Sequence, residues 1–187
     1  MFDDALDSVR NGEVVGIPTD TVYGLAIDPT NPDAVSALFD LKGRPDSKPL
    51  GLLLGNVDDA ENFGDLDGVA GHLARRFWPG ALTLVVTPRV VLSDWVGDTQ
   101  VRTVGIRVPD HDVAREFLNL TGPLAVTSAN RSGQPEVMDD VEARLIFGDE
   151  VAAYIPGRAP GGMASTVVDA TGARPIVIRQ GAVDISA

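Results

Sequence analysis

Residues 13–43 read EVVGIPTDTVYGLAIDPTNPDAVSALFDLKG, and this stretch decides the fold class. Three of its first five residues are β-branched, which favours a short strand. Segment 18–24 begins with a proline, which lacks a backbone donor, so we expect a loop there. Asn31 and Pro32 suit the N-cap and first turn of a helix that ends at Gly43. A strand, a polar loop and an amphipathic helix in succession predict a sheet covered by helices.

Helical and strand-like patterns alternate along the remaining sequence. The apolar spacing predicts helices at 3–11, 66–77, 110–121 and 139–147, and strands at 50–54, 81–87, 103–108, 124–127, 166–170 and 175–179. Neither a repeat nor a linker divides these segments. We therefore expect a single α/β (α+β) domain over residues 1–187, with polar loops at the strand ends where the sites of such folds usually lie.

The composition limits the class of protein. A chain of 187 residues, 44% of them hydrophobic, is long enough to bury one core, and no apolar run reaches the roughly 18 residues that span a bilayer. The first ten residues are acidic and polar, which does not suit a secretory signal. Because the chain has no cysteine, disulfides, thiolate metal sites and a cysteine nucleophile are excluded. We expect a cytoplasmic protein without membrane contact.

The charges are distributed unevenly along the chain. Asp and Glu number 27 against 15 Lys and Arg, a net charge of −12, which disfavours broad contact with nucleic acid. The two lysines, Lys42 and Lys48, nevertheless share one short segment with Arg44 between them. Such a segment suits an ordinary helix C-terminus followed by a solvated loop. Clustered in an acidic chain, the three cations instead favour a site for a phosphate-rich small molecule.

Polar groups recur at the ends of predicted strands. Ser128 and Asn130 follow one strand, where they suit either a polar turn or contacts to a ligand. Strand alternation places Thr103 and Arg107 on one face of another strand. The guanidinium there either lies in water or receives a carboxylate. Each pattern therefore fits a structural role as well as a binding role.

Other motifs carry less information. Loop 157–162 is rich in glycine and proline but lacks the Lys-Ser/Thr pair of a Walker A loop, so we expect a mobile surface loop or lid. Ser165 and Arg179 suit hairpin positions, and the isolated His72 and His111 are interpreted as structural. No protein nucleophile or metal cluster stands out. This favours a reaction between bound substrates, catalysed by positioning and charge stabilisation, such as phosphoryl or nucleotidyl transfer.

Seven motifs occur in a recognisable order. They are PTDTVYGLAIDPTN, KGRPDSKPL, WPGALTLVV, VGIRVPDH, TSANRSGQP, STVVDATG and IVIRQGAV. Together they resemble the YrdC/Sua5 family, the L-threonylcarbamoyladenylate synthases, over roughly residues 10–183. The resemblance implies a twisted, mostly mixed β-sheet flanked by helices, with a basic concave cleft.

The resemblance also implies a reaction and its partners. L-threonine, bicarbonate and ATP, with Mg²⁺ carried by ATP, would give L-threonylcarbamoyladenylate and pyrophosphate. The product would serve the t6A37 modification of tRNA and pass to the downstream tRNA threonylcarbamoyl-transfer machinery. Because the threonine carbamate attacks the nucleotide, the enzyme would need no nucleophile and no protein-bound metal of its own.

Matching motif positions assign roles to individual residues, again as implications of the resemblance. The catalytic cations that face the ATP phosphates would be Lys42, Arg44 and Lys48. The residues on the ATP side would be Arg44, Lys48, Thr103, Ser128, Asn130 and Arg179. The residues around threonine would be Thr21, Arg107 and Ser165. Of these, Arg107 is the natural partner of the threonine carboxylate.

The chain departs from the family pattern in three respects. Leu53 stands where longer relatives often have a histidine, so one threonine contact is expected to be absent or supplied by the backbone. Glu136 stands where many have a serine, and its charge does not suit a neighbouring phosphate. The chain ends soon after Arg179, so we expect the short, single-domain form of the family.

Two other functions remain as alternatives. An RNA-binding or ribosome-maturation factor could use the same cleft and make weak RNA contacts, although the net charge of −12 argues against it. A carbamoyl-transfer module of the kind found in hydrogenase maturation proteins would be accompanied by acylphosphatase and zinc-finger segments. The sequence contains neither, which disfavours that alternative.

Overall fold

The protein is described here from a computed structural model, which covers residues 2–43, 50–92, 96–98 and 100–186. In these residues the helices are α1 (Asp3–Arg10), α2 (Pro32–Lys42), α3 (Val57–Phe63), α4 (Val69–Phe77), α5 (Asp112–Thr121), α6 (Asp140–Phe147) and the 3-10 turn η1 (Gly148–Glu150). The strands are β1 (Val15–Ile17), β2 (Gly24–Ile27), β3 (Gly51–Leu53), β4 (Leu82–Val86), β5 (Val104–Arg107), β6 (Leu124–Ser128), β7 (Ala153–Tyr154), β8 (Thr166–Asp169) and β9 (Ile176–Arg179).

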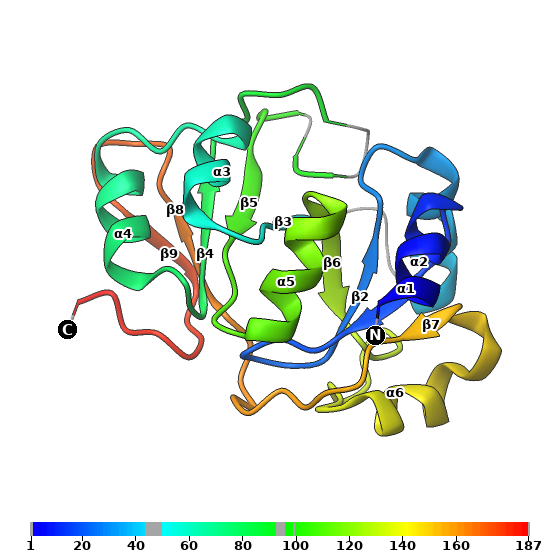
Figure 1. The fold of residues 1–187 in the computed structure, drawn as a ribbon. Helices are drawn as coiled ribbons and strands as arrows, with labels where there is room; N and C mark the ends of the chain where they lie inside the picture. The colour runs from blue at the N-terminus through cyan, green and yellow to red at the C-terminus, as the bar shows by residue number, and fades with distance from the viewer. Residues whose placement is uncertain (1, 44–49, 93–95, 99, 187) are drawn as a thin grey trace.

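The nine described strands form one mixed sheet in the order β7-β1-β2-β6-β3-β5-β4-β8-β9. Three neighbouring pairs are parallel, namely β1 with β7, β3 with β5, and β4 with β8. The remaining pairs are antiparallel. In Figure 1, α2 and α4 lie towards opposite ends of the sheet, and α6 lies near β7. The expected mixed sheet flanked by helices is therefore confirmed.

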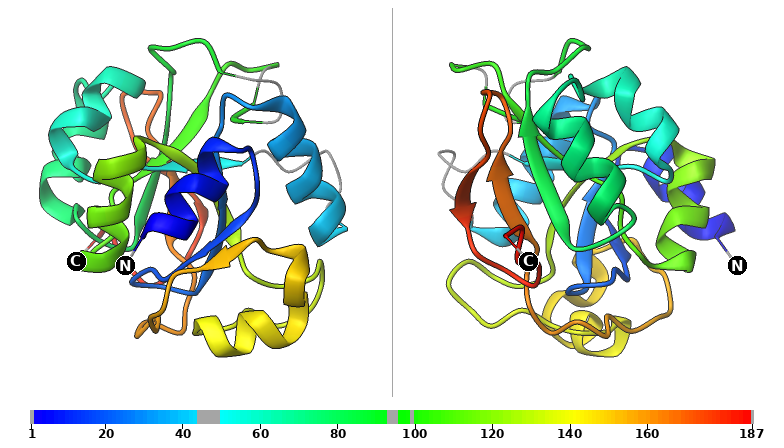
Figure 2. Two further views of the ribbon diagram at one scale, coloured as in Figure 1. Left: turned by 45° about the vertical axis from the view of Figure 1, so that its right-hand side comes forward. Right: turned by 90° about the vertical axis from the view of Figure 1, so that its left-hand side faces the viewer.

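Two apolar clusters cover opposite faces of the sheet. Leu52 belongs to one cluster and its neighbour Leu53 to the other, because successive strand residues point to opposite sides. The first cluster contains buried residues of α2 and α4. The second contains residues of α1 and α5, which lie side by side in Figures 1 and 2. Phe2 joins them, with its ring centroid 5.4 Å from that of Phe117.

The ends of α2 follow from its local sequence. The side chain of Asn31 accepts hydrogen bonds from the backbone N–H groups of Asp33 and Ala34, at 3.0 Å and 3.2 Å. Pro32 occupies the first turn, where its missing donor costs nothing. Gly43 ends the helix at φ 58°, a left-handed conformation that suits glycine. The predicted boundaries of this helix are confirmed.

Other boundaries differ from the sequence-based expectations. Gly24 was expected in a loop, but it begins β2 and pairs with Ser128 across the sheet. The sequence predicts a helix from residue 110, but α5 begins at Asp112, and the ring of His111 at its N-cap accepts from the Ala114 N–H at 3.4 Å. Neither α3 nor β7 was predicted, since both are short and take their stability from packing and pairing rather than from a periodic pattern.

The loop 157–162 is tied to its surroundings by backbone hydrogen bonds. The Ala159 N–H donates to the Met138 carbonyl at 2.7 Å, and the Gly162 N–H donates to the Thr21 carbonyl at 2.9 Å. Ala159 is also buried. These contacts do not support the interpretation of this loop as a mobile lid.

Candidate active site

One face of the sheet carries the predicted polar residues. The strand register aligns Ser128 on β6, Arg107 on β5 and Arg179 on β9 towards the same side. Between them, Gly51 and Gly105 leave the floor without side chains, and a Cβ atom at Gly51 would lie 3.1 Å from the Gly105 carbonyl oxygen. The result is a hollow over the central strands.

This hollow has a volume of about 360 Å³, which is within the range of small-molecule sites. A larger hollow of about 480 Å³ lies elsewhere, lined by mostly apolar residues such as Leu6, Phe63 and Val91. None of the predicted site residues that the structure describes lines the larger hollow, whereas the smaller one contains converging hydroxyl and guanidinium groups. The candidate site is therefore the smaller hollow, which we call the polar pocket.

Arg107 is the most constrained charged residue of the polar pocket. Its Nε–H donates to the Gly80 carbonyl at 3.0 Å, one Nη donates to the Thr21 hydroxyl at 3.0 Å, and the other donates to Asp20. Burial lowers the pKa of the Arg107 guanidinium, and the Asp20 carboxylate opposes that shift. Since arginine starts from a very high pKa, the side chain remains a cation.

The hydroxyl groups of Thr21 and Thr19 continue the hydrogen bonding of Arg107 as a chain in which each group donates to the next. Thr19 Oγ1 donates to the Val22 carbonyl at 2.7 Å, so its own hydrogen is committed. The Thr21 hydroxyl lies 3.0 Å from Thr19 Oγ1 and must be the donor of that pair. Thr21 therefore accepts from Arg107 and donates to Thr19. A ligand that reaches Thr21 must bring a donor, such as an amine or a hydroxyl group.

A second polar cluster joins β4, β8 and β9. The Ser165 and Thr83 hydroxyls lie 2.8 Å apart, and Ser165 is buried. Arg179 donates from Nη2 to the Ser165 carbonyl at 2.8 Å and to its hydroxyl at 3.3 Å. Arg179 also adds a positive charge close enough to depress the pKa of Arg107. Two guanidinium groups thus line one pocket, and each is a group that can bind a carboxylate or phosphate oxygen.

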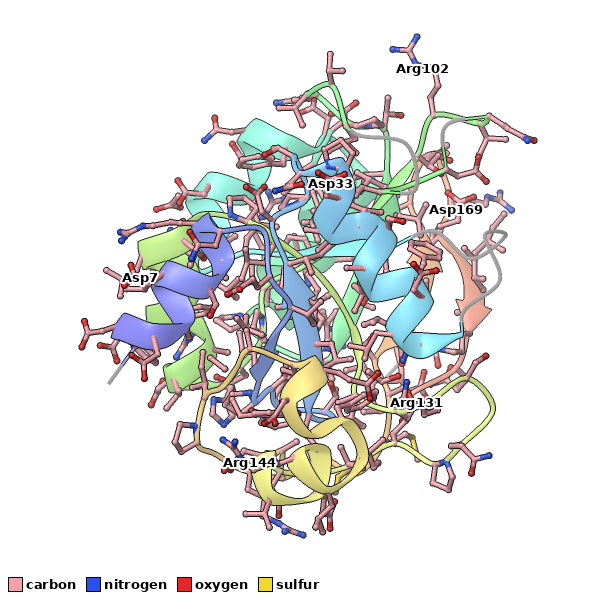
Figure 3. All side chains as sticks on the ribbon, turned by 90° about the vertical axis from the view of Figure 1, so that its right-hand side faces the viewer. Asp7, Asp33, Arg102, Arg131, Arg144 and Asp169 are labelled. Carbon is pink, nitrogen blue, oxygen red and sulfur yellow. The ribbon has the colours of Figure 1, made fainter. Side chains whose placement is uncertain are left out.

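Lys42 holds the loop that follows β6 in place through hydrogen bonds. Its buried ammonium donates to the carbonyl oxygens of Ser128 and Asn130, the latter at 2.8 Å, and to the Asn130 side-chain oxygen at 3.0 Å. Arg131 reaches back from the same loop and donates to the Leu41 carbonyl at 2.6 Å (Figure 3). The C-terminus of α2 and this loop are therefore held together as one unit.

Most of the predicted site residues meet in one place. Those that line the polar pocket are Thr21, Thr103, Arg107, Ser128, Ser165 and Arg179. Lys42 and Asn130 do not line it, and they contact the loop of Ser128 instead. Arg44 and Lys48 lie outside the described residues. The alternative in which the guanidinium of Arg107 lies in water is wrong, because its side chain is only 7% exposed.

Sequence reasoning missed several polar residues of this region. Thr19 and Thr83 line the pocket, and Asp20 contacts Arg107. Thr19 and Asp20 are part of the PTDTVYG segment, so their place beside Thr21 was the available signal. No comparable signal pointed to Thr83, because its contact with Ser165 spans 82 positions of sequence.

The described residues contain no group of three or more His, Cys, Asp or Glu side chains that could hold a metal ion. Two carboxylates, Asp98 and Glu136, do line the polar pocket. No helix in the part of the chain that the structure describes is long and apolar enough to span a bilayer.

The fold and the site together define the class of protein: a single α/β domain with a polar pocket of small-molecule size over the central strands of a mixed sheet. The profile of the Sua5_yciO_yrdC family, described as "Telomere recombination", matches residues 7–181. The chain belongs to this family.

Relatives and solved structures extend the comparison. The chain is 44% identical over 182 residues to a "Putative threonylcarbamoyl-AMP synthase" of Mycobacterium tuberculosis, covering 96% of this chain and 83% of the relative. It is 35% identical over 185 residues to the "Threonylcarbamoyl-AMP synthase" of Bacillus subtilis, where it covers 94% of this chain and 51% of the relative.

A solved structure of Sua5 from Pyrococcus abyssi, complexed with L-threonine, superposes with a TM-score of 0.87 at 34% identity. The match covers 95% of this chain and 53% of the Sua5 chain, so the protein spans about half the length of that relative. The fold is that of the Sua5 structures over nearly the whole chain.

Proposed function

We propose that this chain is a threonylcarbamoyl-AMP synthase, a transferase and more narrowly a nucleotidyltransferase. L-threonine, bicarbonate and ATP would be converted to L-threonylcarbamoyladenylate and pyrophosphate. The product would supply the t6A modification of tRNA through a separate transfer machinery. The relatives of that name, at 35% and 44% identity, support this proposal.

The state of Arg107 is the observation that carries the proposal. Arginine has five N–H donors, and the described residues accept from three of them. One N–H therefore remains on each terminal nitrogen of a guanidinium that lines the pocket. Two such donors match the two oxygens of a carboxylate, which is how arginine binds carboxylates most strongly. We assign this group to the carboxylate of L-threonine.

The reaction requires no protein nucleophile. Threonine, as an ammonium, and bicarbonate would combine to a carbamate, with loss of one water and one proton. A carbamate oxygen would then form a bond to the α-phosphorus of ATP, while the bond from that phosphorus to pyrophosphate breaks. Arg107 would hold the threonine carboxylate, and Ser128, Thr103 and Arg179 would line the nucleotide side. The contribution of the protein is alignment and charge stabilisation.

Mg²⁺ would enter with ATP. The polar pocket offers carboxylates at Asp98 and Glu136, and Mg²⁺ typically binds one or two carboxylates together with substrate phosphates. The ion would therefore be held mainly by phosphate oxygens and water, and it would neutralise charge on the leaving pyrophosphate. A protein cage for the ion is not part of the proposal.

The RNA-binding alternative is not favoured. The named relatives are synthases, and a net charge of −12 opposes long-range attraction of a phosphate backbone. Weak contact with tRNA remains outside the proposed activity.

The decisive experiment measures pyrophosphate release with ATP, Mg²⁺, bicarbonate and threonine, omitting each in turn. We expect release that depends on threonine and bicarbonate, with the adenylate product identified by mass spectrometry. An Arg107→Ala variant should lose the response to threonine, whereas Arg89→Ala, which removes an exposed arginine paired with Asp65, should retain it. Pyrophosphate release that ignores threonine would refute the proposal.

A further inference from the structure

Asp20 carries a partly buried carboxylate to which the proposed reaction gives no role. Its side chain is 11% exposed and accepts a hydrogen bond from Nη2 of Arg107. Arg107 lines the polar pocket, and so do the two neighbours of Asp20, Thr19 and Thr21, but Asp20 itself does not. Asp20 is thus bound to a guanidinium that lines the pocket without lining the pocket itself.

We propose that Asp20 is a positioning residue, which fixes the guanidinium plane of Arg107 so that its two remaining N–H groups meet the carboxylate of the amino-acid substrate. The inference rests on the proposed function for the identity of that substrate. In this proposal Asp20 affects the affinity for threonine through Arg107, without contacting threonine itself.

The three acceptors around Arg107 are not equivalent. The Gly80 carbonyl and the Thr21 hydroxyl are neutral, whereas Asp20 forms the charge-assisted hydrogen bond, which is the stronger kind. Asp20 also supplies the opposite charge that a buried guanidinium requires. Removing it would leave Nη2 without an acceptor among the described residues and would leave a desolvated cation uncompensated.

The position of Asp20 is itself fixed by close packing. The loop 157–162 lies against its backbone, since a Cβ atom at Gly161 would be 2.3 Å from the Asp20 carbonyl oxygen. The next residue, Gly162, donates to the Thr21 carbonyl at 2.9 Å. Asp20 thus contacts loop 157–162 through its backbone and the guanidinium of Arg107 through its side chain. The Asp20 carboxylate can therefore determine the orientation of the Arg107 guanidinium.

The test compares Asp20→Ala, which removes the acceptor, with Asp20→Asn, which keeps an acceptor oxygen and removes the charge. The control is Asp65→Asn, which alters an exposed carboxylate that accepts from Arg89 at 2.9 Å. We expect Asp20→Ala to raise the KM for threonine by about tenfold or more, because a small misplacement of a substrate-binding group is costly. The KM for ATP should change less than about twofold, and Asp20→Asn should recover part of the threonine affinity.

A second measurement does not depend on turnover. In ¹⁵N NMR spectra, the Nη–H groups of a fixed guanidinium give separate signals, and we expect them for Arg107, assigned by their loss in Arg107→Lys. In Asp20→Ala these signals should merge as the group rotates, while thermal unfolding and circular dichroism establish that the fold is kept. If the alanine variant does not fold, Asp20→Asn gives the same two readouts with a smaller effect.

Separate Nη signals that persist without Asp20 would overturn the proposal. So would threonine and ATP KM values that rise together, because that pattern indicates general loosening. If the unaltered protein releases no threonine-dependent pyrophosphate, the proposed function fails. The NMR result would then still decide whether Asp20 fixes Arg107.

Discussion

Lys42 and Asn130, 88 positions apart in the sequence, are joined by two hydrogen bonds. The Lys42 ammonium donates to the Asn130 backbone carbonyl at 2.8 Å and to its side-chain oxygen at 3.0 Å. The Ser128 hydroxyl donates to the same side-chain oxygen at 2.7 Å. The lysine that the sequence assigned to the ATP phosphates is thus bound to the loop that carries Ser128. Its influence on a nucleotide would reach the pocket at least partly through this loop.

Lys42→Met should disturb the nucleotide side and the fold together. The variant keeps the apolar stem but leaves buried carbonyl acceptors without their donor, so we expect a loss of about 3 kcal/mol in unfolding free energy. Urea unfolding and the KM for ATP are the measurements. In a double-mutant cycle with Asn130→Ala, a coupling energy of about 1 kcal/mol or more is expected for residues in one network. Additive effects would show that the two residues act independently.

Arg107→Ala should act on threonine rather than on ATP. The variant removes the carboxylate partner, so we expect kcat/KM for threonine to fall by a factor on the order of 100, or about 3 kcal/mol. Arg107→Lys should recover little, because an ammonium cannot replace a two-pronged donor. Steady-state kinetics with either substrate varied makes the comparison. A change confined to the ATP dependence would mean that Arg107 is wrongly assigned.

Gly105→Val should fill the floor of the polar pocket. A Cβ atom at Gly105 would already lie 3.2 Å from the Thr83 methyl group, so the added methyl groups must enter the hollow. We expect weaker binding of both substrates and a stability loss of about 1–3 kcal/mol from overpacking. Calorimetric titration measures the binding. As a control, Gly68→Ala at φ +61° adds backbone strain in open space and should leave binding unchanged.

Tyr23 should make the protein sensitive to alkali. Burial raises the pKa of the Tyr23 hydroxyl, which donates to the Ile155 carbonyl, well above its usual value of 10.0. Since the unfolded chain releases this proton at a lower pH than the folded protein, stability is full below pH 10 and falls above it. The slope is up to about 1.4 kcal/mol per pH unit for one group. Unfolding free energies measured in urea between pH 8 and about pH 11.5 would test this.

Tyr23→Phe is the variant that isolates this effect. It removes the ionisable group, so the alkaline slope should become shallower. A smaller slope should remain from Tyr154, because burial also raises the pKa of its hydroxyl. An identical slope in Tyr23→Phe would contradict the assignment.

Arg44 and Lys48 lie outside the described residues, and their place beside the ATP phosphates stays a prediction. Arg44→Ala or Lys48→Ala should each lose about 2–4 kcal/mol of transition-state stabilisation, which corresponds to a fall of about 30- to 1000-fold in kcat/KM for ATP. Arg89→Ala serves as a matched loss of positive charge away from the pocket. Undiminished turnover in both variants would leave the segment as a helix terminus only.

The predictable parts of the fold are those that depend on residues close together in the sequence. Asn31 and Gly43 mark the ends of α2. The strands expected at 166–170 and 175–179, with Ser165 and Arg179 in hairpin positions, correspond to the antiparallel pair β8 and β9. Gly24 was assigned to a loop because glycine is typical of turns. Its place in β2 rests on pairing with Ile17 of β1 and with Ser128 of β6. The second partner lies about a hundred residues later, which no local pattern contains.

In the site too, features that depend on local sequence were predictable, whereas contacts between distant residues were not. Alternation along one strand was enough to place Arg107 and Gly105 on one face, and the register confirms this. That Arg107 is buried against Asp20 depends on a contact across 87 positions. Five of the six candidate residues that line the polar pocket belong to the motifs that carry the family resemblance, and Thr103 directly precedes one of them. Thr83 also belongs to one of these motifs but had no chemical signal of its own.

The glycines Gly51 and Gly105 have a consequence for the engineering of this protein. Because the floor of the polar pocket is open only where side chains are missing, any substitution at either position adds atoms to a crowded place, and the volume available to a bound molecule can only shrink. An attempt to enlarge the pocket for a bulkier amino acid therefore has to change the residues of its walls.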